Sequence, residues 1–220
     1  MNRFRARAVL LDHDGTIVDS EGVHLQIWND ILSVYGQRLS QSFWIESCSG
    51  IPTPDTAAAL VEKFALPLSA AELARKKLEA TAIHLQTAAF PLVSGVYDLL
   101  GQLHETDVQL GVVSGADRAG VEASLERHGL RRFLNFVVGG DDVLRSKPAP
   151  DVYLKALDIL GLPAQDCIAV EDSEHGVQAA KAAGICCIAL RTEYTATHDL
   201  TAADHILTSF AQLGELLQQV

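Results

Sequence analysis

The chain has 220 residues, of which 48% are hydrophobic, and its formal net charge is −11. This length suits one large domain, or a domain with a smaller insert, and the apolar fraction supports a sizeable core. Nucleic acids and anionic membrane surfaces attract basic patches, and the largest basic cluster here is Arg75-Lys76-Lys77, so neither partner is expected.

The first predicted element is a strand formed by the apolar run "AVLL" (8–11). No convincing strand run follows over the next 70 or so residues. The segments "VHLQIWNDILSVYG", "PDTAAALVEKFA" and "SAAELARKKLEATAIHLQ" have helical patterns, and Ser69 is the expected N-cap of the third. We therefore expect a helical domain over 20–89, inserted into a core domain formed by 1–19 and 90–220. An insert that follows the carboxyl end of a strand typically covers a site there.

Further apolar runs recur later in the chain, each bounded by turn or polar residues. They are "VQLGVV" (108–113), "FVVGG" (136–140), "CIAV" (167–170) and "ICCIAL" (185–190). Because their apolar residues are continuous rather than alternating, these runs suit strands buried on both faces of a parallel sheet. Helical patterns lie between or after them, at 96–104, 118–128, 150–160, 176–183 and 210–217. This alternation predicts an α/β fold with a doubly wound parallel sheet.

The cysteines and the apolar runs indicate where the protein works. Cys48, Cys167, Cys186 and Cys187 show no metal-ligand spacing, and the adjacent Cys186 and Cys187 lie in the apolar run "GICCIAL", where we expect a strand. A reducing, cytoplasmic compartment is the simplest interpretation. No apolar stretch has the length of a signal peptide or of a membrane span. We therefore expect a cytoplasmic protein without a membrane partner.

Four of the predicted strands end in residues that can do chemistry. In chain order these residues are Asp12, Asp14 and Gly15; Ser114 and Gly115; Asp142 and Lys147; and Glu171 with Asp172. In open α/β sheets, ligands bind outside the carboxyl ends of the strands. We therefore expect acid, hydroxyl, ammonium and acid side chains to meet at one edge of the sheet.

These residue types suit a metal ion and a phosphate group. Buried carboxylates are costly unless they are paired, hydrogen-bonded or bound to metal, and Asp12, Asp14 and Asp172 offer the hard oxygen ligands that Mg²⁺ prefers. Lys147 and Ser114 are expected to hold the remaining phosphate oxygens, and the glycines permit close approach of backbone N–H groups to an anion. The sequence contains neither GxxxxGK[ST] nor GxGxxG, so no nucleotide-binding loop is indicated.

The segments "DHDGTIVDS", "VVSG", "SKPAPD" and "VEDSEHG" resemble, in this order, the four motifs of the haloacid dehalogenase superfamily of phosphohydrolases. The helical insert resembles the C1-type cap of that family, and the resemblance covers essentially the whole chain. It implies a Rossmann-like core and a Mg²⁺-dependent phosphoric monoester hydrolase that acts through an aspartyl-phosphate. "DSEGVH" is similar to the start of the subgroup that contains β-phosphoglucomutase and sugar-phosphate phosphatases. The expected partner is a small phosphorylated metabolite, and the expected state is a monomer or weak dimer.

The resemblance also implies a role for each motif residue. Asp12 becomes the nucleophile and Asp14 the general acid/base. Asp12 and Asp172 bind Mg²⁺ together with the backbone carbonyl of Asp14, and Glu171 is a supporting acidic neighbour of the metal. The residues that hold the phosphoryl group are Ser114, Gly115 and Lys147.

Other polar residues near these motifs have less defined roles. His13 lies between the two aspartates, where the family usually has an apolar residue, and its side chain is expected to point away from both of them. The resemblance of "DSEGVH" to the subgroup implies that His24 lies near the hinge into the cap and faces the substrate, and Asp19 is expected at the hinge itself. Lys76, or its neighbour Lys77, is a candidate substrate contact from the cap, although a solvated helix face is the more usual fate of such residues.

Several alternatives remain open at this stage. A β-phosphoglucomutase carries an arginine shortly after a glycine of the early cap, whereas Thr53 stands near that position in "SGIPTPDT", which favours hydrolysis. Phosphoglycolate is an alternative substrate. Dehalogenases proper lack the second aspartate, so Asp14 argues against that activity. Receiver domains are also doubly wound, bind Mg²⁺ and are phosphorylated on an aspartate, but they are about half as long as this chain. A degenerate family member that only binds phosphorylated ligands is a further alternative, and the presence of every motif residue argues against it.

Overall fold

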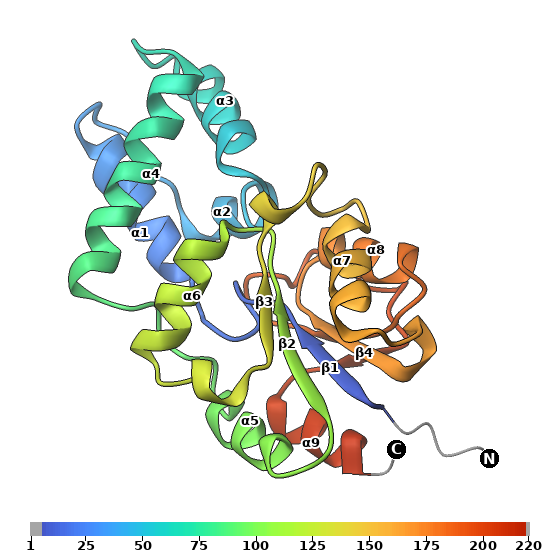
Figure 1. The fold of residues 1–220 in the computed structure, drawn as a ribbon. Coiled ribbons are helices and arrows are strands. Elements are labelled where there is room, and N and C mark those ends of the chain that lie inside the picture. Colours follow the sequence, from blue (N-terminus) through green and yellow to red (C-terminus); the bar gives the residue numbers. More distant parts are fainter. Residues whose placement is uncertain (1–5, 219–220) are drawn as a thin grey trace. The chain divides into compact units, whose positions relative to one another are not determined.

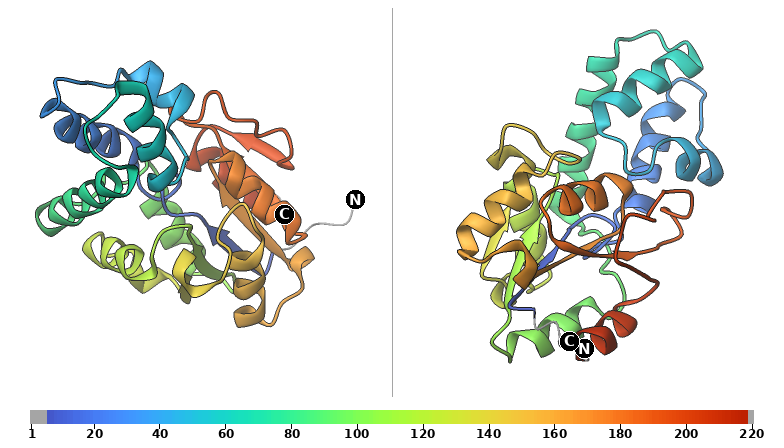
Figure 2. Two further views of the ribbon diagram at one scale, coloured as in Figure 1. Left: turned by 90° about the horizontal axis from the view of Figure 1, so that it is seen from above. Right: turned by 90° about the vertical axis from the view of Figure 1, so that its right-hand side faces the viewer.

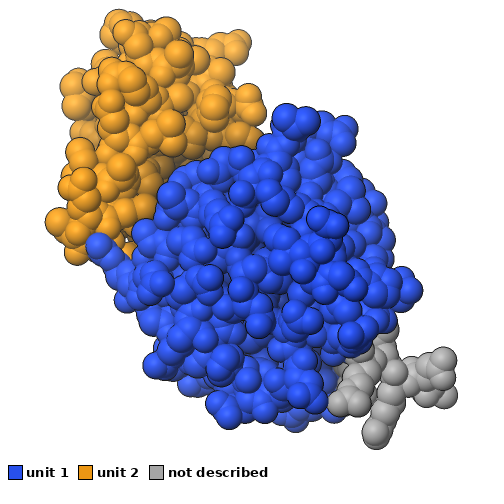
Figure 3. Space-filling view, in the orientation of Figure 1, with its two compact units in different colours: residues 1–19, 91–192, 198–220 blue, residues 20–90, 193–197 orange. Residues whose placement is uncertain are grey.

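A computed structural model describes residues 6–218 of the chain. The contacts divide the chain into two compact units, which Figure 3 colours separately. Unit 1, here called the core unit, comprises the residues up to 19, residues 91–192 and the residues from 198 onward. Unit 2, the helical unit, comprises residues 20–90 and 193–197. No helix within residues 6–218 combines the length and the apolar character that crossing a membrane requires.

The core unit is built on a parallel sheet with the strand order β3-β2-β1-β4-β5-β6 (Figure 1). The strands are β1 (Ala8–Leu11), β2 (Gln109–Val113), β3 (Phe136–Val138), β4 (Cys167–Glu171), β5 (Cys186–Leu190) and β6 (His205–Leu207). At the carboxyl end of β1, Leu11 pairs with Val112 on one side and with Val170 on the other. The carboxyl ends of the three central strands therefore meet at one edge. The predicted doubly wound parallel sheet is confirmed.

Helices cover both faces of this sheet (Figures 1 and 2). They are α5 (Val96–His104), α6 (Arg118–Arg127), α7 (Asp151–Leu160), α8 (Glu174–Ala182) and α9 (Phe210–Gln218). Ala8 and Leu10 of β1 belong to the apolar cluster that contains side chains of α7 and α8. Val9 faces the other way and lines a pocket with residues of α5 and α9. This alternation assigns Asp12 to the α7 and α8 face, because it continues the series of Ala8 and Leu10.

Two details of the sheet differ from the sequence prediction. Strand β6 has three residues, none of them buried, and it therefore lacks the continuous apolar run by which the other strands were found. Strand β3 ends at Val138, because Gly140–Asp142 form a turn of 3₁₀ helix instead of continuing the strand.

The helical unit has its own hydrophobic core. Its helices are α1 (Glu21–Ser33), α2 (Gln41–Ser47), α3 (Thr53–Phe64) and α4 (Ala70–Thr87). Trp28, Trp44 and Leu60 are among the buried side chains of this core. Ser69 is the N-cap of α4, as predicted, and it forms a capping box with Glu72. The short helix α2 was not predicted.

A segment that lies far along the chain, Glu193–Thr197, belongs to the helical unit. Gln41 donates a hydrogen bond to Glu193 at 2.7 Å, and the hydroxyl of Thr197 donates to the carbonyl of Ile45 at 3.3 Å. Gln41 and Ile45 both lie in α2, so the segment Glu193–Thr197 packs against a helix that the sequence pattern did not reveal. The expected helical domain, 20–89, did not include these five residues.

Candidate active site

The hydrogen-bond ladders of the sheet continue one residue past the strands and place two predicted site residues. The N–H of Asp12 donates to the carbonyl of Val170 at 2.9 Å, and the N–H of Ser114 donates to the carbonyl of Val138 at 2.9 Å. Asp12 and Ser114 are both almost fully buried, with relative exposures of 6% and 1%. Each therefore has a fixed backbone at the same edge of the sheet.

Lys147 lies at the centre of a buried ionic cluster. Its ammonium nitrogen is 2.5 Å from Asp12 Oδ1 and 2.6 Å from Glu171 Oε1, and it donates to the carbonyl of Val113 at 2.8 Å. The hydroxyl of Tyr153 donates to the same Glu171 oxygen at 2.5 Å. One lysine thus connects the residue that follows β1 with the last residues of β2 and β4, as the predicted convergence of strand ends requires.

Burial and charge shift the pKa values of this cluster. Burial is the largest influence on Asp12 and Glu171, and it raises the pKa of both carboxyl groups above the ordinary values, although Lys147 opposes it. Burial lowers the pKa of Lys147, but the two carboxylates outweigh it and raise that pKa above the ordinary value. Lys147 is therefore held as an ammonium ion. Its single positive charge does not balance the carboxyl groups around it, because the pKa values of Asp12 and Glu171 stay above the ordinary ones.

The acids of this cluster can hold a metal ion. Asp12, Glu171 and Asp172 each offer a carboxylate oxygen within 4.8 Å of the others, and all three residues are buried. Three carboxylates and one ammonium leave an excess of two formal negative charges, which suits a divalent cation. Glu171 Oε2 is also buried without a hydrogen-bond partner among the described residues. The donor set and the charge of these residues fit a hard divalent metal.

Gly15 makes room for one of these acids. Its φ is +79°, and a Cβ built on it would lie 1.9 Å from Asp172 Oδ2. Any side chain at residue 15 would thus displace the Asp172 carboxylate and would also adopt a strained backbone. Gly15 therefore serves two purposes: it allows the turn after β1, and it leaves the space that the carboxylate of Asp172 occupies after β4.

The loops after β2 and β3 are in close contact. A Cβ at Gly140 would lie 2.3 Å from the carbonyl oxygen of Gly115, so only glycine fits there. Ser114 Oγ accepts the N–H of Ala116 at 3.0 Å, which leaves its own hydroxyl hydrogen available as a donor. Asp142 accepts the N–H of Gly139 at 3.0 Å, and this hydrogen bond lowers its pKa. Asp142 thus stabilises the loop, and it is not among the clustered acids.

His13 does not point away from both aspartates, so that expectation is wrong in part. Its Nδ1 atom lies 3.2 Å from Asp14 Oδ2, and its Nε2 atom lies 2.9 Å from Ser124 Oγ on α6. The alternation of side chains does direct His13 to the face opposite Asp12. The alternation does not hold at Asp14, because the strand has ended there. The carbonyl of His13 already accepts the N–H groups of Ile17 and Val18, so the backbone is in a turn.

Within the helical unit, His24, one of the substrate contacts expected from the sequence, lies beside Lys77. Lys77 of α4 is only 3% exposed, and its ammonium lies 3.1 Å from Nδ1 of His24 and 2.9 Å from the hydroxyl of Thr81. It also lies over the ring of Trp28, 5.7 Å from the ring centre. Lys76, the lysine singled out from the sequence, is exposed. Of the two candidates, Lys77 is the one that the fold places beside His24.

Sequence reasoning missed Tyr153 and did not separate Lys77 from Lys76. Tyr153 lies on the buried face of α7 with Val152 and Ala156, where an aromatic residue is typical of an ordinary core. Adjacent lysines on a helix face different directions, but the register of α4 against its neighbours decides which one is buried. No local signal distinguishes either residue.

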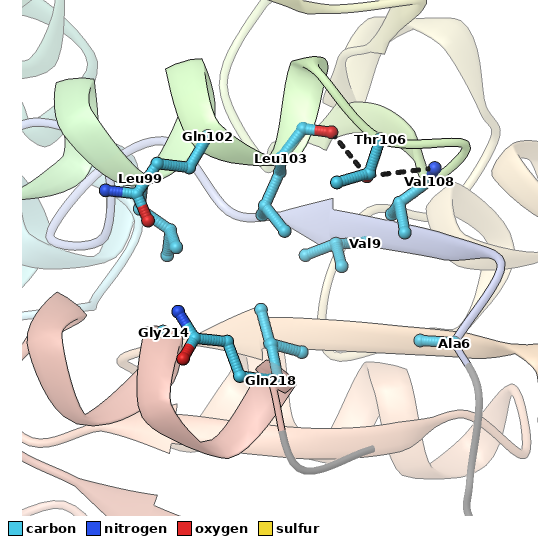
Figure 4. A pocket seen from close by; sticks show the side chains of 10 residues that line it. Ala6, Val9, Leu99, Gln102, Leu103, Thr106, Val108, Gly214 and Gln218 are labelled. Atoms are coloured by element: carbon cyan, nitrogen blue, oxygen red, sulfur yellow. Dashed lines mark hydrogen bonds between the residues drawn. The ribbon is translucent and has the colours of Figure 1, made fainter.

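A separate pocket of about 320 Å³ lies at the opposite end of the strands (Figure 4). Ala6, Val9 and Val108 line it near the amino ends of β1 and β2, together with Leu99 and Leu103 of α5. The lining contains no titratable side chain. It is therefore not the site at which the predicted chemistry takes place.

Comparison with known proteins establishes the family. A family model for haloacid dehalogenase-like hydrolases matches residues 9–190. The chain therefore belongs to the haloacid dehalogenase-like hydrolases, and the expected enzyme class, a phosphoric monoester hydrolase of this superfamily, is confirmed.

The relatives place the chain more narrowly within that family. It is similar to the fructose-1-phosphate phosphatase YqaB of Escherichia coli (strain K12), with 34% identity over 187 residues, covering 85% of this chain and 97% of that protein. It is also similar to protein CbbY of Cereibacter sphaeroides, with 30% identity over 220 residues, 95% of this chain and 94% of that protein. A crystal structure of a CbbY variant from Rhodobacter sphaeroides in complex with xylulose-(1,5)bisphosphate matches with a TM-score of 0.79 at 28% identity, covering 95% and 96% of the two chains. The expected placement among the sugar-phosphate phosphatases of this superfamily is confirmed.

Proposed function

We propose that this protein is a Mg²⁺-dependent phosphatase that hydrolyses a sugar or polyol phosphate through an aspartyl-phosphate formed on Asp12. The observation that carries the proposal is the buried cluster in which Lys147 bridges Asp12 and Glu171, with Asp172 close by. Such a cluster combines a nucleophile, a fixed positive charge and acids able to hold a cation. Phosphate monoesters hydrolyse extremely slowly without catalysis, and a covalent intermediate divides the displacement into two steps.

Mg²⁺ is the proposed cofactor, because the clustered groups are hard oxygen donors with an excess of negative charge. Asp12 and Asp172 would hold the ion together with the backbone carbonyl of Asp14, and Glu171 would support them. The bound ion would reduce the repulsion between the attacking carboxylate and the phosphoryl group. Lys147 contributes to the same neutralisation from its own fixed position.

The residues of the chain account for both chemical steps. In the first, a carboxylate oxygen of Asp12 attacks phosphorus, the ester P–O bond breaks, and Asp14 gives a proton to the leaving alcohol oxygen. In the second, Asp14 takes a proton from water, the water oxygen attacks phosphorus, and the acyl-phosphate bond breaks to release phosphate and restore Asp12. Asp14 suits this role because its side chain is one-third exposed, whereas that of Asp12 is buried. Ser114 and Gly115 are proposed to hold the phosphoryl oxygens.

The substrate class is proposed from the relatives and from the helical unit. One relative is a fructose-1-phosphate phosphatase, and a CbbY variant was crystallised with xylulose-(1,5)bisphosphate. In the helical unit, His24 and Lys77 form a polar pair next to Trp28. We propose that this pair recognises hydroxyl or phosphate groups on the part of the substrate that does not react, and that Lys76 is secondary to Lys77.

The test is phosphate release across a panel of phosphorylated metabolites, ranked by kcat/KM. The panel contains ketose and aldose phosphates, polyol phosphates and phosphoglycolate, each assayed with Mg²⁺. We expect the highest kcat/KM for a sugar or polyol phosphate, and a preference for phosphoglycolate would overturn the substrate class. Conversion of β-glucose 1-phosphate to glucose 6-phosphate in the presence of a bisphosphate, without free phosphate, would identify a mutase instead.

We also propose that the protein works in the cytoplasm. Cys48, Cys167, Cys186 and Cys187 are all free thiols, as a reducing compartment would keep them. A monomer or weak dimer is the proposed oligomeric state.

A further inference from the structure

His13 connects a helix of the core unit to the proposed acid/base. Its ring is 3% exposed, and each ring nitrogen has a polar partner: Ser124 Oγ at 2.9 Å from Nε2, and Asp14 Oδ2 at 3.2 Å from Nδ1. Ser124 lies in the middle of α6, and it too is nearly buried, with 7% exposure. The three side chains therefore form a chain of contacts from a packed helix to the Asp14 carboxyl group.

Asp14 lies just beyond the first strand of the sheet. It follows the end of β1 and precedes Gly15, so it lies in a turn and not in a strand. Its side chain is 33% exposed, whereas the Asp12 side chain is 9% exposed and bonded to Lys147. A partly exposed carboxyl group on a turn can rotate about its side-chain torsions, and proton transfer requires a defined position relative to the reacting oxygen.

The imidazole of His13 can restrict that rotation. In the tautomer that carries hydrogen on Nδ1, the ring donates to the ionised Asp14 carboxylate, and Nε2 accepts the hydroxyl hydrogen of Ser124. The serine hydroxyl can also accept, so it suits a ring that is protonated on both nitrogens. An apolar residue at the same position would offer Asp14 no hydrogen bond, and Ser124 would lose this partner as well.

We propose that His13, oriented by Ser124, is a positioning residue that fixes the carboxyl group of Asp14 for proton transfer. The inference rests on the proposed function, because it assigns a supporting group to the same acid/base. It depends on the contact through Nδ1, and not on the presence of a polar residue alone. The two ends of the ring can therefore be tested separately.

The experiment compares His13→Asn with His13→Gln. The asparagine amide nitrogen takes approximately the place of Nδ1 and can still reach Asp14, whereas the glutamine amide extends to the place of Nε2 and keeps only the contact with Ser124. Steady-state hydrolysis of p-nitrophenyl phosphate and of the best sugar phosphate is measured for both variants and for His13→Phe. We expect His13→Gln and His13→Phe to lower kcat by about tenfold or more with KM changed less than twofold, while His13→Asn retains most of the activity.

Ser124→Ala provides the second arm, alone and combined with each histidine variant. In the otherwise unchanged protein it should lower kcat by a few-fold, because the ring loses its anchor. Combined with His13→Phe it should have no further effect on kcat, because the ring that it orients is absent. Thermal unfolding of every variant separates a loss of fold from a loss of positioning.

The outcomes separate the inference from the proposed function. If the unchanged protein releases no phosphate from any monoester, the proposed function is wrong. If it is active but His13→Gln and His13→Asn have equal kcat values in folded protein, the contact with Asp14 has no positioning role. If Ser124→Ala and His13→Phe lower kcat by factors that multiply in the double variant, Ser124 does not act through His13, and the proposed role of Ser124 is wrong.

Discussion

The Nζ atom of Lys147 lies 2.5 Å from Oδ1 of Asp12, although 135 residues separate the two in the sequence. The contact forms because β1 and β2 are adjacent and parallel, and because Lys147 also donates to Val113 at the end of β2. The loop after β3 therefore delivers a cation directly to the residue that follows β1.

Asp12→Asn should abolish turnover without unfolding the protein. The amide is a poor nucleophile and cannot form the acyl-phosphate, while its volume preserves the packing around Lys147. The measurement is hydrolysis of p-nitrophenyl phosphate together with the unfolding temperature. Asp107→Asn, the same chemical change at the amino end of β2, serves as the control and should leave the rate unchanged. More than trace activity in Asp12→Asn would exclude Asp12 as the nucleophile.

Removal of divalent metal should eliminate activity, and Mg²⁺ should restore it. The clustered acids Asp12, Glu171 and Asp172 need a cation to balance their charge, so Mg²⁺ should also raise the unfolding temperature. Asp172→Asn should require a higher Mg²⁺ concentration for half-maximal activity and should reduce the thermal shift. Asp158→Asn, an exposed change on α7, is the matched control. Full hydrolysis in excess EDTA would contradict the metal site.

Gly15→Ala should damage both the fold and the metal site, whereas Gly36→Ala should only destabilise the protein. Both glycines have positive φ, +79° and +71°, so alanine costs about 1–2 kcal/mol in unfolding free energy at either position. Only at Gly15 would the new Cβ lie 1.9 Å from Asp172 Oδ2, since nothing lies within 4 Å at Gly36. Chemical denaturation and the Mg²⁺ dependence of activity distinguish the two. Equal Mg²⁺ dependence in both variants would show that the close approach has no consequence.

Lys77→Met should weaken substrate binding more than Lys76→Met does. Methionine preserves most of the buried volume of Lys77 but removes the charge beside His24, and a charge-assisted hydrogen bond contributes about 1.5–3 kcal/mol. We therefore expect KM for the best sugar phosphate to rise by about tenfold or more in Lys77→Met, with a smaller effect on p-nitrophenyl phosphate. A larger rise in Lys76→Met would reassign the contact to the exposed lysine.

Asp204→Asn should destabilise the protein in a pH-dependent way. Partial burial raises the pKa of Asp204, but hydrogen bonds from Lys181 at 2.6 Å and from the Cys187 N–H at 2.7 Å outweigh it and hold the pKa below the ordinary 3.8. A lowered carboxyl pKa contributes stability that is present above the ordinary value and is lost as pH falls through the folded-state value. The unfolding free energy of Asp204→Asn should thus be lower than that of the unchanged protein by about 1 kcal/mol at pH 7. Denaturant titrations between pH 7 and pH 3 should show the difference shrinking below about pH 4, and a constant difference would contradict the assignment.

The sequence by itself determined the sheet, the insert and the list of strand-end residues. Continuous apolar runs mark strands that are buried on both faces, because such strands cannot expose a polar side, and this signal is local. It failed for β6, whose residues are not buried, and for α2, which is short. Asp12, Ser114 and Lys147 could be found because each directly follows such a run or belongs to a recognisable motif.

The tertiary structure alone decided which side chains meet. His13 reaches Asp14 because the backbone turns at Gly15, and it reaches Ser124 because α6 packs beside that turn. Tyr153 joins the ionic cluster, and Lys77 instead of Lys76 is buried, through the register of whole helices against their neighbours. Such contacts depend on the directions of elements that are distant in the chain. Local sequence patterns carry no information on those directions, because burial and hydrogen bonding are settled only when the elements pack.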